Sequence, residues 1–393
     1  MVTVADSKTT FGSSTRLHGL DALRAGALLL GIVLHSLLPF VTDLGWLVSD
    51  SQSSRWLGIP VFVIHLFRMV LFMMLAGYFG RLVLERRGAG RYFRDRVVRI
   101  LLPFMVFWPV AVASLGYLAV LNAEVHNVPL ASPPTPATPA RHPLLAIPPG
   151  QLWFLLVLME CVVVALVVRA LALRLVGAVR LGQVAAAVGR VLSAPGGVVL
   201  AALPYLGCLL LQGHVLGGIN EPLTLVPSVS ALTAYGGAFA VGWALRASDE
   251  GLGRIARSWP AHLGLALALT GLSLADPGAD TTTPLVASAS VMALAGWCWV
   301  YALLGLCVRF LTKDRPLVRY LADASYWMYL MHLPLLIGFE ILLVALDWPI
   351  AVKLGATWLA VGGVLVVSYH LLVRSTPIGR WLNGRRYPFR LPG

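Results

Sequence analysis

The sequence predicts an all-α protein: a polytopic bundle of about ten transmembrane helices with both termini in the cytoplasm. Three observations predict this fold. Of the 393 residues, 58% are hydrophobic and 12% are charged, and the mean hydropathy is +0.82. A water-soluble fold of this size rarely has such a composition. The apolar residues form continuous runs long enough to cross a bilayer, and the basic residues gather in alternate connections between those runs.

Ten apolar segments can be drawn, of which the fifth and seventh are the shortest. They cover residues 19–41, 61–84, 97–122, 151–173, 196–213, 226–246, 261–275, 284–309, 321–346 and 350–373. The connections after segments two, four, six and eight are rich in arginine, whereas the other connections carry mostly Asp and Glu. By the positive-inside rule, the arginine-rich connections and both termini are cytoplasmic.

The chain is expected to form one transmembrane domain, residues 17–387, between a polar N-terminal tail, 1–16, and a short C-terminal tail, 388–393. No signal peptide is expected, because the first apolar run is too long and continuous for one. The longest outer connection, 124–150, is proline-rich at its centre and therefore not helical there. We expect it to shape access to a site rather than to take part in chemistry.

The four cysteines lie inside apolar runs without metal-ligand spacing, so neither a disulfide nor a metal site is expected. The formal net charge is +13, and the basic residues lie mainly between apolar runs. We therefore expect membrane lipid headgroups or a phosphorylated ligand as partners rather than nucleic acid.

The first segment carries two ionisable residues, Arg24 and His35, which are functional candidates because such groups are costly inside a membrane. On a helix they lie about 16 Å apart along the axis and roughly 20° apart in rotation, hence on one face. The alternative is that both side chains snorkel or satisfy a neighbouring carbonyl. The predicted orientation places Arg24 near the cytoplasmic surface and His35 beyond the midplane.

Further polar groups are predicted at the depth of His35, in the outer half of the membrane. The second, fourth and ninth segments contribute His65, Arg68, Trp153, Glu160, Tyr329 and His332. Each one alone also fits ordinary packing, and Glu160 can simply neutralise Arg68. Together they predict a water-containing cavity, because several charges cannot all be stranded in hydrocarbon.

A second group of candidates lies on the cytoplasmic side, where Arg91, Arg94 and Arg99 follow the second segment. They fit an amphipathic helical turn whose guanidinium groups can hold phosphate through paired hydrogen bonds. The same arginines also fit a role in topology or in contact with lipid phosphate. Because Arg24 is predicted on the same side, the pattern favours a docking site for a phosphate-rich donor.

Four motifs follow one another along the chain: LDALRA with His35, FMMLAGYF before the arginine-rich turn, QLWFLLVL at 151–158 and ASYWMYLMHLPL at 324–335. With them the chain resembles the acyltransferase-3 family of integral membrane proteins, which move acyl groups onto extracytoplasmic glycans. It looks most like the branch that succinylates osmoregulated periplasmic glucans, because of IHLFRM at 64–69, the similar length and the lack of an appended hydrolase-like domain.

The resemblance implies roles for individual residues. Arg24 and His35 match the family's paired arginine and histidine, Arg91 and Arg94 its cytoplasmic arginine pair, and His332 its late histidine–proline element. The implied donor is acyl-CoA, with succinyl as the preferred acyl group, and no permanently bound cofactor is expected. The implied location is the bacterial cytoplasmic membrane, as a multi-pass protein of the cell envelope.

The remaining assignments are hypotheses about mechanism. His35 is expected to act as general base, with a covalent acyl-histidine as the competing route. The other catalytic candidates are Arg68, for an oxyanion or a distal carboxylate, and Tyr329 and His332 as orienting groups. Residues expected to contact the acceptor or orient other groups are His65, Trp153 and Glu160.

Two other functions use the same polar groups. A transporter or flippase of a glycan or lipid-linked precursor would use them as a proton relay and substrate path, although no obvious inverted repeat accompanies them. A glycosyltransferase would want an acidic motif in an early outer connection, and Asp43 and Asp50 are too far apart for one. The sequence is compatible with a monomer or a homodimer.

Overall fold

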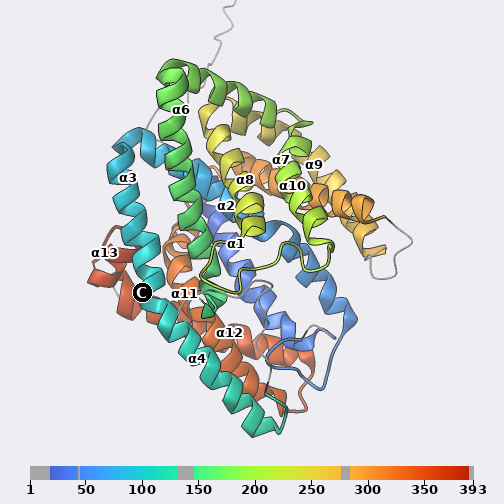
Figure 1. Cartoon of the computed structure of the whole chain (residues 1–393). Coiled ribbons are helices and arrows are strands. Elements are labelled where there is room, and N and C mark those ends of the chain that lie inside the picture. Colours follow the sequence, from blue (N-terminus) through green and yellow to red (C-terminus); the bar gives the residue numbers. More distant parts are fainter. Residues whose placement is uncertain (1–17, 43–44, 131–145, 276–283, 389–393) are drawn as a thin grey trace, which may run out of the picture.

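The computed structural model describes residues 18–42, 45–130, 146–275 and 284–388. Within these ranges the chain is a bundle of helices without strands, which confirms the predicted all-α class (Figure 1). The N-terminal tail, the centre of the proline-rich connection and the last five residues lie outside the described residues. All four cysteines are buried and free.

Ten long helices cover the ten predicted apolar segments. They are α1 His18–Leu37, α2 Gly58–Arg87, α4 Leu102–His126, α6 Trp153–Leu192, α7 Gly197–Gln212, α8 Val229–Ala247, α9 Gly251–Ala275, α10 Leu285–Phe310, α11 Pro316–Val344 and α12 Ile350–Ser368. In the described part of the chain, seven helical stretches are long and apolar enough to cross a membrane, while α7 is apolar but shorter. The protein is thus a polytopic membrane protein. The number of spans and the side on which each end lies stay predictions.

The described residues also form shorter elements. They are α3 Ala89–Arg96, α13 Pro377–Asn383, the 3-10 turns Leu38–Phe40, Arg55–Leu57 and Gly150–Leu152, and the π-helical turns Val97–Leu101 and Tyr369–Arg374. Two sharp bends have glycine at positive φ, which a side chain would disfavour. Gly88 ends α2 at φ +76° and leads into α3. Gly177, at φ +77°, bends α6, so that its second part runs across the top of the view (Figure 1).

The first two long helices lie in the middle of the bundle. Helix α1 packs against α2, α10 and α11, and α2 packs against α8 on its other side. The largest fully buried side chains include Trp297 and Tyr301 of α10 and Met73 and Met74 of α2. The helices that carry Arg24, His35 and Arg68 are therefore central, and α11 lies directly beside them.

Glycines allow α2 and α8 to approach closely. A Cβ added at Gly77 would collide with the backbone oxygen of Phe239, and one at Gly242 with the backbone oxygen of Met74. Small residues at such positions let helix backbones meet, which is a main source of helix association in membranes. The α2–α8 contact therefore depends on both glycines.

Replacing Gly77 with alanine is expected to lower protein stability by about 1–3 kcal/mol, because the added methyl group pushes α2 from α8. The melting temperature in detergent measures this effect. Gly271→Ala of α9 is the matched control, since its Cβ meets no atom within 4 Å, and alanine favours a helix over glycine. Equal melting temperatures for the two variants would contradict the close contact.

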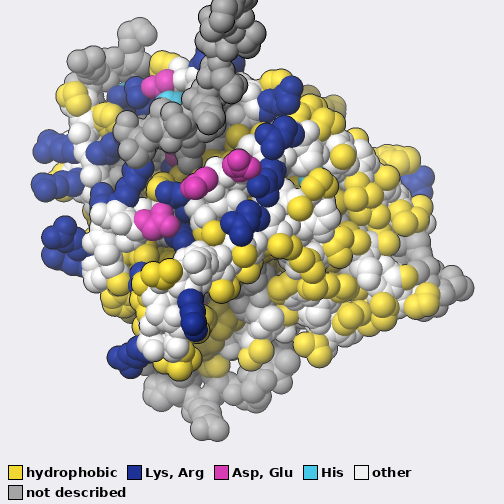
Figure 2. All heavy atoms as spheres, turned by 90° about the horizontal axis from the view of Figure 1, so that it is seen from above, with side chains coloured by type: hydrophobic (Ala, Val, Ile, Leu, Met, Phe, Trp, Pro, Cys, Tyr) yellow, Lys and Arg dark blue, Asp and Glu magenta, His cyan; other side chains and the backbone are white. Residues whose placement is uncertain are grey.

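One end of the bundle is strongly basic. Viewed from above, Lys and Arg side chains gather on one side of this face, and hydrophobic side chains cover the other side (Figure 2). The bend of α6 lies at this end (Figure 1). A basic face of this kind is what the positive-inside rule expects on the cytoplasmic side, where the arginine-rich connections are predicted to lie.

Candidate active site

The imidazole of His35, near the end of α1, lies between two other aromatic rings. It stacks on Trp46, with ring centroids 5.6 Å apart and planes at 22°. On α11, the ring of His332 lies 5.4 Å away at 41°. The structure therefore brings together His35 and His332, two histidines that are far apart in the sequence, because α1 packs along α11.

The backbone of α11 fixes the state of His332. Its Nδ1 lies 2.7 Å from the backbone oxygen of Tyr329. A carbonyl only accepts, so Nδ1 carries the hydrogen, and in the neutral ring Nε2 is the basic nitrogen. The hydroxyl of Tyr329 donates to the backbone oxygen of Gln151 at 2.7 Å, which ties α11 to the start of α6.

Arg68 of α2 reaches the same region because residue 31 is a glycine. A Cβ on Gly31 would collide with Nη1 of Arg68, and Gly31 lies about one helical turn before His35. The Nε of Arg68 is buried without a hydrogen-bond partner. Among the described residues, Arg68 forms no ion pair. A partly covered guanidinium with a buried Nε and no carboxylate beside it is costly, which marks this position as a candidate for binding an anionic group.

His65 lies one turn before Arg68 on α2 and faces a connecting loop. Its Nε2 donates to the backbone oxygen of Gly217 at 2.8 Å. Arg68, His332 and His65 all lie within electrostatic range of His35. The side chains of His35, His65 and Arg68 are only partly covered although the helices that carry them are central. The structure thus brings His35, His65, Arg68 and His332 together, as expected from their predicted common depth in the membrane.

The fourth predicted span contributes less than expected. Trp153 lies against Tyr235 of α8, with ring centroids 5.6 Å apart, and Tyr235 is within electrostatic range of Arg68. Glu160 has one carboxyl oxygen buried without a partner. No ion pair joins Glu160 to Arg68 in the described part of the chain. The structure therefore places Trp153 at the edge of the cluster and gives no contact by which Glu160 neutralises Arg68.

Two residues that the structure brings to the site were given no role by the sequence. The indole Nε1 of Trp46 donates to Oε2 of Glu340 on α11 at 3.4 Å. Glu340 carried a usable signal, since it is an acidic side chain inside an apolar segment. Trp46 carried none, because the position of a loop residue depends on how the loop folds back over the helices.

The predicted donor-binding arginines divide into two kinds. Arg99 pairs with Asp95 at 3.1 Å, and its guanidinium lies against Gly384 near the C-terminus. Arg91 and Arg94 are exposed and form no ion pair with any described residue. Free guanidinium groups can bind phosphate directly, so Arg91 and Arg94 are better placed for this role than Arg99.

Arg24 lies apart from the arginines of α3. Its Nη2 is 3.4 Å from Oδ1 of Asp21, and its guanidinium lies over the ring of Phe79 at 5.9 Å. Its side chain is 39% exposed, which leaves it free to contact a ligand. No contact joins Arg24 to Arg91 or Arg94 among the described residues.

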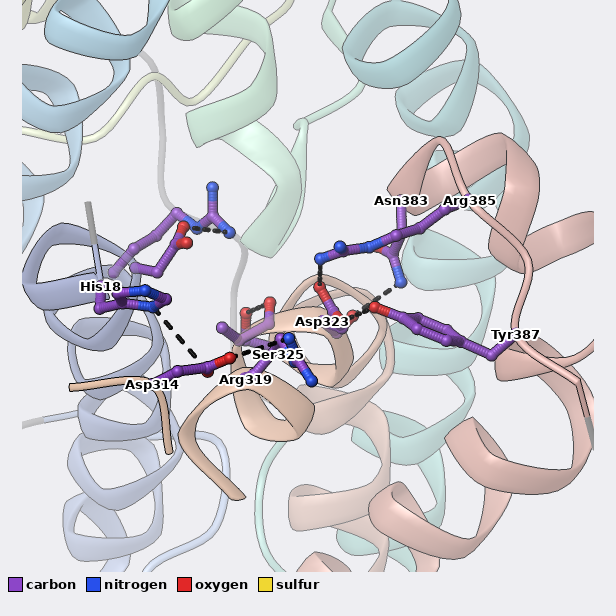
Figure 3. Close-up of polar contacts among 11 residues, drawn as sticks. His18, Asp314, Arg319, Asp323, Ser325, Asn383, Arg385 and Tyr387 are labelled. Carbon is purple, nitrogen blue, oxygen red and sulfur yellow. Dashed lines mark hydrogen bonds and ion pairs between the residues drawn. The ribbon is translucent and has the colours of Figure 1, made fainter. Parts of the chain in front are cut away.

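The start of α11 is held by the C-terminal segment (Figure 3). The buried carboxylate of Asp323 accepts from Arg385 at 2.6 Å and from the hydroxyl of Tyr387 at 2.7 Å. Asn383 donates to the backbone oxygen of Asp323 at 2.8 Å. Nearby, Asp314 pairs with His18 of α1 at 3.8 Å and with Arg319 at 3.0 Å. These contacts fix the helix that carries His332.

Comparisons with known proteins found one family model and a set of relatives that match part of the chain. A family model described as an acyltransferase domain matches residues 17–373. Glucans biosynthesis protein C of Salmonella paratyphi B and that of Salmonella heidelberg are each 31% identical to the chain over 144 residues. The match spans 36% of this chain and 36% of the length of each relative. No solved structure matches the chain.

Proposed function

The chain belongs to the acyltransferase family that matches residues 17–373, and from this premise we propose that it moves an acyl group from cytoplasmic acyl-CoA to a hydroxyl of an extracytoplasmic glycan. The observation that carries the proposal is the cluster of His35, His332 and Arg68, which lies among central helices and remains partly accessible. The name of the Salmonella relatives refers to glucans, which supports a glucan acceptor. We place the acyltransferase domain at 17–387, in the bacterial cytoplasmic membrane.

His35 is the proposed general base. As neutral imidazole it takes the proton of the acceptor hydroxyl while that oxygen attacks the thioester carbonyl. The new C–O bond forms, the C–S bond breaks, and the proton passes from His35 to the leaving CoA thiolate. Transfer through an acyl-histidine is the competing route. His332 and Tyr329 orient His35 or the acceptor, and His65 and Trp153 line its approach.

Arg68 is proposed to bind negative charge in the transition state or on the acyl group. Support comes from its buried Nε without a partner and from the space that Gly31 provides for its guanidinium. The developing oxyanion needs such a donor, and a succinyl group carries a distal carboxylate that pairs well with arginine. Succinyl-CoA is therefore the proposed donor.

A coupled assay tests this function. The purified protein in lipid nanodiscs is incubated with succinyl-CoA and a glucan, and free CoA and succinylated glucan are measured. The proposal expects CoA release that depends on the glucan. Movement of a glycan or lipid-linked precursor across a vesicle membrane without CoA release would instead identify a transporter.

Replacing both Arg91 and Arg94 with glutamine is expected to raise KM for the acyl-CoA about tenfold or more, because each lost hydrogen bond to a charged group costs about 1.5–3 kcal/mol. Since these arginines are proposed to hold phosphates and not the reacting atoms, kcat should change much less. The control is Arg180→Gln of α6, which replaces an exposed arginine that pairs with no acidic side chain among the described residues. An equal rise in KM for the control would attribute the effect to general surface charge.

A further inference from the structure

His35 is oriented without a hydrogen bond. Its Nδ1 is buried and has no partner, and no hydrogen bond joins either ring nitrogen to another described residue. A catalytic histidine is usually oriented by a hydrogen bond at the ring nitrogen that does not react. Here the contacts that restrain the ring are the stack with Trp46 and the tilted contact with the ring of His332. Trp46 is the more parallel of the two, at 22° against 41°.

The loop that carries Trp46 is itself firmly attached. Val48 is 1% exposed and packs against Leu333 and Ile337 of α11. The backbone oxygen of Leu47 accepts from the side-chain amide of Asn122 at 3.0 Å. Trp46 is therefore a fixed part of the bundle rather than a freely moving loop residue, and its ring can restrain another ring.

Glu340 adds the second restraint. Its Oε2 accepts from the indole of Trp46, while the residue is 5% exposed and its Oε1 has no partner. A hydrogen bond at Nε1 fixes the rotation of the indole about its side-chain bonds, which stacking alone leaves open. The carboxylate of α11 thus acts on His35 of α1 through the ring of Trp46.

We propose that Trp46 is a positioning residue that holds the imidazole of His35 with its edge toward the substrate, and that Glu340 sets the angle of Trp46. Because the nitrogen lone pair lies in the plane of the imidazole, and Trp46 stacks on one face of the ring, the acceptor hydroxyl approaches along the ring edge. The inference rests on the proposed function of His35 as general base.

Variants of Trp46 and Glu340 test the proposal. Trp46→Ala is expected to lower kcat for glucan-dependent CoA release by about 10- to 100-fold, the cost of a misplaced reacting group, with KM for succinyl-CoA changed less than about twofold. Trp46→Phe, which keeps a ring on His35 but has no N–H for Glu340, should recover part of the kcat, to about the level of Glu340→Leu. Glu340→Leu should lower kcat, whereas Glu340→Gln, which still offers an oxygen to the indole, should lower it less. Trp56→Ala, in the same loop and 66% exposed, should leave kcat unchanged.

The outcomes separate the inference from the function on which it rests. The positioning role is overturned if Trp46→Ala has the same kcat as the wild type, or if Trp46→Phe is as slow as Trp46→Ala. In either case, the role of His35 as general base still stands if the wild type is active and His35→Ala is inactive. If Trp46→Ala does not fold, the comparison of Glu340→Leu with Glu340→Gln tests the proposal instead. Equal kcat values for these two variants would overturn the role of the hydrogen bond between Trp46 and Glu340. A wild type without glucan-dependent CoA release would remove the proposed function itself.

Discussion

Replacing His35 with alanine is expected to lower kcat for acyl transfer by about 10²–10⁴-fold, the usual contribution of a general base. The reason is that the variant lacks the imidazole proposed to take the proton, while His332 and His65 are each held in place by a hydrogen bond to a backbone oxygen. Steady-state release of CoA in nanodiscs measures the effect. The melting temperature of the same samples reports whether the variant is folded.

The control for His35 is His262→Gln in α9. His262 is also buried, but its two ring nitrogens lie against the backbone oxygens of Ser258 and Pro195, so its loss should not change kcat of the folded protein. Equal kcat for His35→Ala and wild type would exclude both the general base and the acyl-histidine. Rapid quenching of the wild type with labelled succinyl-CoA separates these two routes, because only the second leaves label on the protein.

Removing one partner of the buried ion pair between Asp50 and Lys353 is expected to destabilise the protein by about 3–5 kcal/mol. The Nζ and Oδ2 atoms are 2.6 Å apart, and the side chains are 0% and 2% exposed. Lys353→Met leaves the buried carboxylate of Asp50 without its counter-charge and with only the backbone N–H of Gln52, at 2.9 Å, as a donor, which is the costly case. The melting temperature in detergent or nanodiscs should therefore fall steeply for this variant and for Asp50→Ala.

Two further variants isolate the cause. The double variant Asp50→Asn with Lys353→Met removes both charges and should regain much of the lost stability, because no charge is left buried alone. Glu250→Gln breaks the exposed pair with Arg254, at 2.9 Å and with Glu250 73% exposed, and should leave the melting temperature nearly unchanged, because exposed ion pairs add little stability. A double variant as unstable as Lys353→Met would assign the effect to shape rather than to charge.

Part of the site could be predicted from how deep each residue lies in the membrane along its helix. The rise per residue and the orientation of each span placed His35, His65, Arg68 and His332 at one level, and the structure brings them within electrostatic range. The pairing of Arg99 with Asp95, four residues earlier, was also readable from helical spacing. The family resemblance supplied the activity, because chemistry does not follow from helix periodicity.

Contacts between residues far apart in the sequence could not be predicted from the sequence. Asp50 and Lys353 were predicted in two separate outer connections, and only the folded loop brings them together. Trp46 reaches His35 for the same reason. Glu160 was expected near Arg68 from depth alone, but depth does not decide which way a side chain points around a helix.

The attachment of Asp323 to Arg385 and Tyr387 has a consequence for biosynthesis. A ribosome makes the chain from the N-terminus, so α11 enters the membrane before the residues that neutralise its buried carboxylate exist. The helix that carries His332 is therefore locked only after residue 387 has been made. A chain cut short before residue 385 keeps the buried acid of Asp323 but lacks both side chains that compensate it.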